Sequence, residues 1–182
     1  MHDNSGISFV FDRQDRQTHI DSYTFYLRYT GPLPAGNDVK VDITINERLT
    51  LPLRARPILR GYEEFADLPE GRSIDAYSLE EIATAKTVAL ADPARNEPRD
   101  LYDLWYLTSD AGIEMDHLSP AICEKLDFRG KPCQGLQQAI ARREARLEAL
   151  WTSRLAHQMV SLPPFEQVFR ALRRTLRHAN LM

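Results

Sequence analysis

The first part of the chain alternates apolar and polar residues with the two-residue period of a β-strand. In the segment 39–46 the aliphatic side chains fall on one face and the polar ones on the other; the first set is Val39, Val41, Ile43 and Ile45, and the second is Lys40, Asp42, Thr44 and Asn46. Segments 23–30 and 7–11 are rich in aromatic and β-branched residues and predict two further strands. The Gly, Pro, Asn and Asp residues of 31–38 predict a long loop that closes an antiparallel hairpin.

After residue 76 the apolar residues recur with the 3.6-residue period of a helix. Ser78 and Glu81 form a capping box that begins a helix running to about Leu90. Pro98 suits the first turn of a second helix, which ends near Gly112. Three more helices are predicted over 119–126, over 134–159 and after Pro163-Pro164. The pattern therefore predicts an α+β protein with a strand-rich part, 1–75, and a helical lobe, 76–182.

Two of the predicted helices carry a continuous apolar stripe that would face a core. In the long helix the stripe consists of Leu136, Ile140, Leu147, Trp151 and Leu155. In the last helix it consists of Phe165, Val168, Phe169, Leu172 and Leu176.

Composition limits what this chain can be. Its 182 residues, 43% hydrophobic and 27% charged, suffice for one domain or for two small lobes that share a core. No apolar run approaches the length of a membrane helix and the N-terminus lacks a signal-peptide pattern, so we expect a cytoplasmic protein with no membrane partner. Cys123 and Cys133 have neither zinc-ligand spacing nor a disulfide framework around them, which predicts two ordinary thiols.

Lys86 interrupts the apolar arc of the first predicted helix. It lies three or four residues from Ile82, Ala83, Ala89 and Leu90, all of which belong to that arc. An unpaired ammonium is costly to bury. Lys86 must therefore extend to solvent, pair with a carboxylate or face a ligand.

Asp100 and Asp103 lie about 60° apart on the second helix, which is apolar on most sides. Both carboxylates would therefore emerge on one side of a mostly buried element. A purely structural explanation is also available: Arg99 and Asp103 could form an i,i+4 ion pair, while Asp100 compensates the helix dipole.

Asp42 occupies the middle of a strand whose opposite face is aliphatic. If its own face meets water, Asp42 is an ordinary polar strand residue. If it instead faces a lysine and two aspartates from neighbouring helices, the oxygen atoms could hold Mg²⁺ while the ammonium neutralises a polyphosphate.

Taken in order, these segments resemble the later motifs of the AbiEii-type (AbiEii/AbiGii) nucleotidyltransferase toxins, the abortive-infection proteins of bacterial type IV toxin–antitoxin pairs. The resemblance covers roughly residues 23–108 and rests on VKVDIT (39–44), SLEEIATAK (78–86) and PRDLYDL (98–104), with Thr84 where the family commonly has Ala. It implies a nucleotidyltransferase-like, polymerase β-like core with a partial mixed sheet and a C-terminal helical lobe. It also implies Mg²⁺-dependent transfer of NMP from an NTP to an acceptor, which in some relatives is the 3′ end of tRNA, and a cognate antitoxin as partner.

The resemblance assigns roles residue by residue. Asp42 matches the third acidic residue, a metal ligand, and Lys86 the motif lysine that contacts the triphosphate. Asp100 and Asp103 match the two aspartates of the last motif, with Arg99 as its basic neighbour. Arg95 matches, with looser spacing, the arginine that follows the lysine helix and binds nucleotide.

One family motif has no counterpart before the Asp42 strand. That motif is a Gly-Gly or Gly-Ser turn followed by Asp-x-Asp on a strand, and residues 1–38 contain neither. Because this aspartate pair holds both ions in two-metal phosphoryl transfer, we expect weak metal binding and slow or no catalysis. The sequence is then either a piece of a longer protein or a degenerate relative.

The net charge of −3 conceals an uneven distribution. Residues 1–137 carry 15 basic and 23 acidic side chains, a net −8, whereas 138–182 carry eight Arg and three Glu, a net +5. Four of these arginines form a stripe along the last predicted helix: Arg170, Arg173, Arg174 and Arg177. The stripe is either the solvated face of an amphipathic helix or a track for a phosphate backbone. The second reading supports the alternative function, a non-catalytic module that binds nucleic acid or a partner protein.

Overall fold

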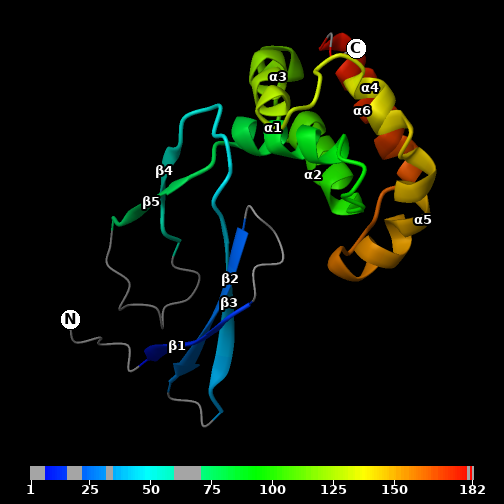
Figure 1. Ribbon diagram of the computed structural model, residues 1–182. Coiled ribbons are helices and arrows are strands. Elements are labelled where there is room, and N and C mark those ends of the chain that lie inside the picture. Colours follow the sequence, from blue (N-terminus) through cyan, green and yellow to red (C-terminus); the bar gives the residue numbers. More distant parts are fainter. Residues whose placement is uncertain (1–6, 16–21, 32–34, 60–70, 180, 182) are drawn as a thin grey trace. The chain divides into compact units, whose positions relative to one another are not determined.

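Three antiparallel strands form where the sequence alternates with period two. In the computed structural model, which describes residues 7–15, 22–31, 35–59, 71–179 and 181, they are β1 (Ser8–Gln14), β2 (Ser22–Thr30) and β3 (Asn37–Thr44), with β2 in the middle (Figure 1). Phe25 pairs with Val41 and Thr24 with Asp42, so the predicted hairpin is confirmed. A β-bulge interrupts the β1–β2 ladder between Phe11 and Arg13.

The register gathers the apolar side chains of this sheet on one face. The face, called here the apolar sheet face, combines aromatic and aliphatic residues of all three strands: Phe9, Phe11, Tyr23, Phe25, Leu27, Tyr29, Val39, Val41 and Ile43. Phe11 is 58% exposed and Ile43 45%. The aliphatic face of the 39–46 segment is thus largely exposed.

A second, two-stranded sheet pairs β4 (Arg54–Pro57) with β5 (Ser73–Ala76), neither of which the sequence pattern predicted. Residue contacts divide the chain into a sheet unit, 1–48 with 56–74, and a helical unit, 49–55 with 75–182.

The helical unit contains six α-helices among its described residues. They are α1 (Leu79–Leu90), α2 (Pro98–Ser109), α3 (Ser119–Phe128), α4 (Leu136–Ala141), α5 (Glu144–Leu155) and α6 (Phe165–His178), with short 3₁₀ segments at Met115–Leu118 and Ala156–Gln158. The Ser78 Oγ accepts the Glu81 backbone N–H at 3.1 Å, which confirms the predicted cap of α1. Pro98 occupies the first turn of α2, as predicted. The α+β fold class is therefore confirmed.

The core of the helical unit follows the predicted stripes. All five stripe residues of 136–155 and all five of α6 are buried. Their aromatic members pack with α2, since Trp151 contacts both Tyr102 and Phe165, and Phe165 stacks on Phe169. Each fully buried side chain of this size stabilises the fold by about 1.5–3 kcal/mol. The arc predicted for α1 is only partly buried, because Leu79 is 40% exposed.

The single helix predicted over 134–159 was wrong, since two helices, α4 and α5, meet at Arg142 and Arg143. The Arg143 N–H still bonds to the Ile140 carbonyl, but its side chain turns inward to the α1–α2 loop. A straight helix would place that side chain elsewhere on its circumference, so the break accompanies this inward contact.

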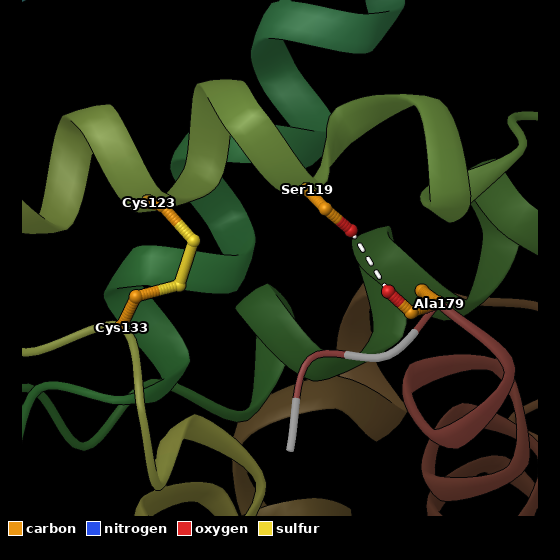
Figure 2. The surroundings of a disulfide bond; sticks show 4 residues. All are labelled: Ser119, Cys123, Cys133 and Ala179. Atoms are coloured by element: carbon orange, nitrogen blue, oxygen red, sulfur yellow. Dashed lines mark hydrogen bonds between the residues drawn. A yellow bond between two sulfur atoms is a disulfide. The ribbon is translucent and has the colours of Figure 1, made fainter.

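The expectation of two free thiols was also wrong. Cys123 on α3 forms a disulfide with Cys133 in the following loop (Figure 2). Gly130, with φ at +65°, turns the chain back after α3, which brings the two Cα atoms to 5.0 Å. Closing a loop of this length stabilises a fold by about 3 kcal/mol. Nearby, the Ser119 Oγ donates to the Ala179 carbonyl at 2.8 Å and joins α3 to the end of α6 (Figure 2).

A buried ion pair fixes the segment that enters the helical unit. Lys125 and Glu81 are each 1% exposed, and their Nζ and Oε1 atoms lie 2.6 Å apart. The other Glu81 oxygen accepts from the backbone N–H of Leu51 at 3.0 Å and from the Thr50 hydroxyl at 2.9 Å. These contacts explain why 49–55 belongs with the helices.

Among the described residues, no helix combines the length and hydropathy that crossing a bilayer requires.

Candidate functional site

The α1–α2 helical hairpin brings the predicted lysine and aspartates together. Lys86 lies in the second half of α1, and Asp100 and Asp103 lie in the first two turns of α2. The Ser78 N-cap fixes the start of α1 and Pro98 fixes the start of α2, so local sequence signals set the position of each side chain along its helix. We call this group, with Arg95 from the intervening loop, the Lys86 cluster.

Lys86 pairs with both aspartates. Its Nζ lies 2.8 Å from Asp100 Oδ1 and 2.6 Å from Asp103 Oδ2. The Lys86 side chain is 19% exposed and Asp103 is 32% exposed, whereas Asp100 is 1% exposed. The cluster therefore has a buried end at Asp100 and an end that solutes can reach at Asp103.

Arg95 is the second cation of the cluster. Its Nε contacts Asp100 Oδ2, and its Nη2 donates to Oδ1 at 3.3 Å, a two-pronged arrangement that suits a carboxylate. Burial alone would raise the pKa of Asp100, but the hydrogen bonds from Arg95 and Lys86 outweigh it and hold the pKa below its ordinary value. Asp100 is thus ionised at neutral pH and serves as the anchor of both cations.

Arg143 fixes the loop that carries Arg95. Its guanidinium donates to the backbone carbonyls of Asp92 and Arg95 and to Asn96 Oδ1, the last at 2.8 Å. It is 7% exposed, and burial lowers its pKa although Asp92 opposes that change. The role of Arg143 has no signal in the sequence, because its partners are neutral oxygen atoms and no charged residue at a regular spacing marks them.

Arg99 is exposed in the first turn of α2. The alternative in which Arg99 pairs with Asp103 is not what the described residues show, because the partner of Asp103 is Lys86. The lysine on an apolar arc therefore pairs with carboxylates, one of the three outcomes that its position allowed.

Asp42 belongs to the sheet unit, on the face opposite the apolar sheet face. Its Oδ1 accepts from the Thr24 hydroxyl at 2.6 Å, and its Oδ2 lies 3.0 Å from Lys40 Nζ. The Thr24 hydrogen bond and then the Lys40 contact lower the pKa of Asp42. Its assignment to the same site as Lys86 stays a prediction.

The stripe of Arg170, Arg173, Arg174 and Arg177, called here the α6 arginine stripe, borders a groove between α5 and α6. Three of its members line that groove together with three carboxylates: Arg170, Arg173 and Arg177 with Glu144, Glu148 and Glu166. Arg173 Nη1 lies 4.0 Å from Glu144 Oε2. The groove carries no net charge, so it offers a phosphate backbone little electrostatic attraction, and the role of the stripe in nucleic-acid binding stays a prediction.

The carboxylates of the described residues do not form a magnesium site. Within the described ranges, no group of three or more His, Cys, Asp or Glu side chains is placed to hold a metal ion. Both oxygens of Asp100 already accept from cations, and Asp103 pairs with Lys86. A divalent ion would have to displace these partners, so the Lys86 cluster is built to hold two cationic side chains.

The family model described as "Nucleotidyl transferase AbiEii toxin, Type IV TA system" matches residues 3–172, which includes the whole Lys86 cluster. No curated protein matches this chain significantly.

Proposed function

This chain belongs to the AbiEii nucleotidyl transferase toxin family of type IV toxin–antitoxin systems, and from that membership and the Lys86 cluster we propose that it binds an NTP for transfer of its NMP to an acceptor. The observation that carries the proposal is the convergence of Lys86 with Asp100 and Asp103 at 2.6–2.8 Å. The same residues carry the resemblance to the family motifs.

Lys86 and Arg95 are the residues that contact the triphosphate in this proposal. Lys86 can reach a ligand because its side chain is partly exposed and its partner Asp103 lies at the accessible end of the cluster. Arg95 is half exposed, and it is held in place by Asp100 and, through its carbonyl, by Arg143. Arg99, exposed one residue before Asp100, adds a third cation at the opening. Pre-positioned cations stabilise the charge that develops on a transferring phosphoryl group.

Family membership implies a divalent metal, and Mg²⁺ would neutralise phosphate charge when bound. The Lys86 cluster does not supply its ligands, and Asp42 is the one remaining acidic residue that the resemblance assigns to it. No Asp-x-Asp pair precedes Asp42 in this chain. We therefore propose that the chain binds nucleotide but turns it over slowly.

The acceptor and the partner follow from the family alone. Type IV toxin–antitoxin membership implies a cognate antitoxin. The resemblance suggests the 3′ end of tRNA as acceptor, and the cytoplasm, which supplies both NTP and tRNA, as the place of action. The Cys123–Cys133 disulfide is more typical of oxidising compartments, so a thiol titration of protein isolated under non-reducing conditions bears on this point.

The test is transfer of label from each α-³²P-labelled NTP to bulk tRNA in the presence of Mg²⁺. We expect slow but measurable labelling that falls about 10²-fold in Lys86→Met, because a positioned cation contributes on that order to phosphoryl-transfer catalysis. Asp103→Asn is expected to reduce labelling as well. The matched control is Asp110→Asn, at the exposed C-terminal cap of the same helix, which should label as the unchanged protein does.

Two results would contradict the proposal. One is labelling in Lys86→Met equal to that of the unchanged protein. The other is failure of triphosphate nucleotides to bind at all, measured by equilibrium dialysis, while circular dichroism shows folded protein. Binding of RNA without any nucleotide binding would favour the non-catalytic binding module instead.

A further inference from the structure

A cationic pocket lies where α4 meets α5, beside the loop that carries Arg95. It encloses about 320 Å³ and is lined on its polar side by Arg142, Arg143, Arg146 and Asn96, with Ala91 and Ala139 among its apolar residues. We call it the α4–α5 pocket. Among the residues that the structure describes, no carboxylate lines it. Its positive charge is therefore not balanced within the pocket.

The three arginines have different roles. Arg143 is buried and already bonded to the α1–α2 loop, so it forms a fixed wall; in the described structure its Nε has no hydrogen-bond partner. Arg142 and Arg146 are exposed, and within the described part of the chain neither side chain takes part in an ion pair or hydrogen bond. Two guanidinium groups are thus free to bind an anion at the opening of the pocket.

The surroundings favour an anion further. Arg143 occupies the N-cap position of α5, whose 12 residues begin without a side-chain cap, so backbone N–H groups and the helix dipole add positive potential there, which Glu144 in the first turn offsets in part. Asp92, in the loop that also carries Arg95 and Asn96, pairs with Lys131 at 3.0 Å and accepts the Ala94 N–H at 3.0 Å. Asp92 is thus satisfied locally by Lys131 and Ala94.

A comparison with the groove beside the α6 arginine stripe shows why this pocket is the stronger candidate. That groove has three arginines and three glutamates, whereas the α4–α5 pocket has three arginines and no acid. A neighbouring cavity of about 440 Å³ shares Ala91, Ala139 and Arg142 with the pocket and is mainly apolar, with Lys131 among its lining residues. Both cavities have a mainly apolar lining, so a nucleotide base could be accommodated beside phosphate charge that the arginines hold.

We propose that the α4–α5 pocket binds the phosphate groups of nucleotide units, either along an RNA strand or in a free nucleotide, through Arg142 and Arg146. This site is additional to the Lys86 cluster, although the two share the 92–96 loop through the Arg143–Arg95 contact. It does not require catalysis, so it can fail or hold independently of the transfer activity proposed above.

The experiment measures fluorescence anisotropy of a labelled 12-nucleotide single-stranded RNA on the full chain, over a series of salt concentrations. In Arg142→Gln/Arg146→Gln we expect affinity to fall at least about tenfold, and the slope of log K against log salt to decrease by about 1.4, since each phosphate contact on a single strand contributes about 0.7. Arg146→Gln is compared with Arg154→Gln, an equal charge change at another exposed position on α5, which should have little effect.

Competition by ATP and by inorganic tripolyphosphate distinguishes the two sources of phosphate. Displacement of the RNA by either at concentrations comparable to that of RNA nucleotides indicates a nucleotide site. Weak displacement with strong RNA binding indicates a strand site. Both outcomes support the pocket, provided that the binding depends on Arg142 and Arg146.

A second variant tests the pocket without removing an arginine. Ala139→Glu places a carboxylate at the floor and should weaken RNA binding, while thermal melting by circular dichroism checks folding. The proposal is overturned if Arg142→Gln/Arg146→Gln binds as the unchanged protein does, or if Arg154→Gln weakens binding as much as Arg146→Gln. It is also overturned if Arg170→Gln/Arg174→Gln on the α6 arginine stripe accounts for the whole loss instead.

Discussion

The sheet unit and the helical unit carry equally clear apolar patterns, yet only the helical unit buries its pattern. The stripes of α5 and α6 are fully covered, while none of the described residues of the sheet unit is buried and Phe9 and Phe11 remain more than half exposed. Periodicity assigns side chains to a face, but a face becomes a core only when another element packs on it. The apolar sheet face is thus specified by sequence without being covered.

The ion pairs of the two units also differ in how far they are buried. The ion pairs of β1–β3 are exposed, as between Lys40 and Asp42, whereas Lys125–Glu81 and Lys86–Asp100 have a partner that is 1% exposed. Exposed pairs are screened by water and contribute little. A buried pair is costly to form, but losing one partner leaves the other charge without compensation.

The largest expected effect comes from breaking the buried pair of the helical unit. Lys125→Met leaves Glu81 buried without its cation and should reduce the free energy of unfolding by about 3–5 kcal/mol, measured by urea denaturation. Lys40→Met in the sheet unit is the matched control and should leave the urea midpoint unchanged. Equal losses in both variants would remove the distinction between the units.

Core truncation should give the next largest difference. Leu104→Ala removes a side chain that is 0% exposed and should cost about 2–5 kcal/mol. Phe11→Ala removes a ring that is 58% exposed and contacts mainly Phe25, so its cost should stay below about 1 kcal/mol. If thermal melting shows a larger loss for Phe11→Ala, the sheet face is covered in solution.

The smallest effect is the pH dependence of the Lys86 cluster. Because the folded pKa of Asp100 lies below its ordinary value of 3.8, its stabilising contribution is present above that value and is lost as the pH falls through the folded pKa. Urea denaturation from pH 6 to pH 2.5 should therefore show that the free energy of unfolding falls more steeply with decreasing pH in the unchanged protein than in Asp100→Asn. An equal fall in the free energy of unfolding with decreasing pH in both proteins would show that Asp100 makes no such contribution.

Much of the helical unit could be predicted from local patterns. The Ser78 cap, Pro98 and the ten stripe residues are local or periodic signals, and all appear where the sequence places them. The spacing of Asp100 and Asp103 also predicted that both carboxylates emerge on one side of α2, where Lys86 contacts them. Such signals depend on residues within one or two turns of each other, so they can be read without the fold.

The failures involve contacts between elements. Helical periodicity across 134–159 gave no sign that the helix breaks at Arg143, because the cause is a contact with carbonyls about 50 residues away. Likewise the disulfide depends on the turn at Gly130, and the burial of Lys125 depends on Glu81, 44 residues earlier. Neither the charges nor the spacing of residues along the chain predicts these contacts.

By itself, the sequence determined strands β1–β3, helices α1, α2, α3 and α6, the apolar stripes of the helical unit, and the residues that carry the resemblance to the AbiEii family. Only the tertiary structure decided which charges meet: Lys86 with Asp100 and Asp103, and Arg143 with the loop that carries Arg95. It also placed Arg142 and Arg146 beside a pocket, where neither has an ion-pair partner among the described residues. The physical reason is the distance along the chain over which each kind of interaction acts. Capping and periodicity act within a few residues, whereas pairing and desolvation of charges depend on distances that only packing sets.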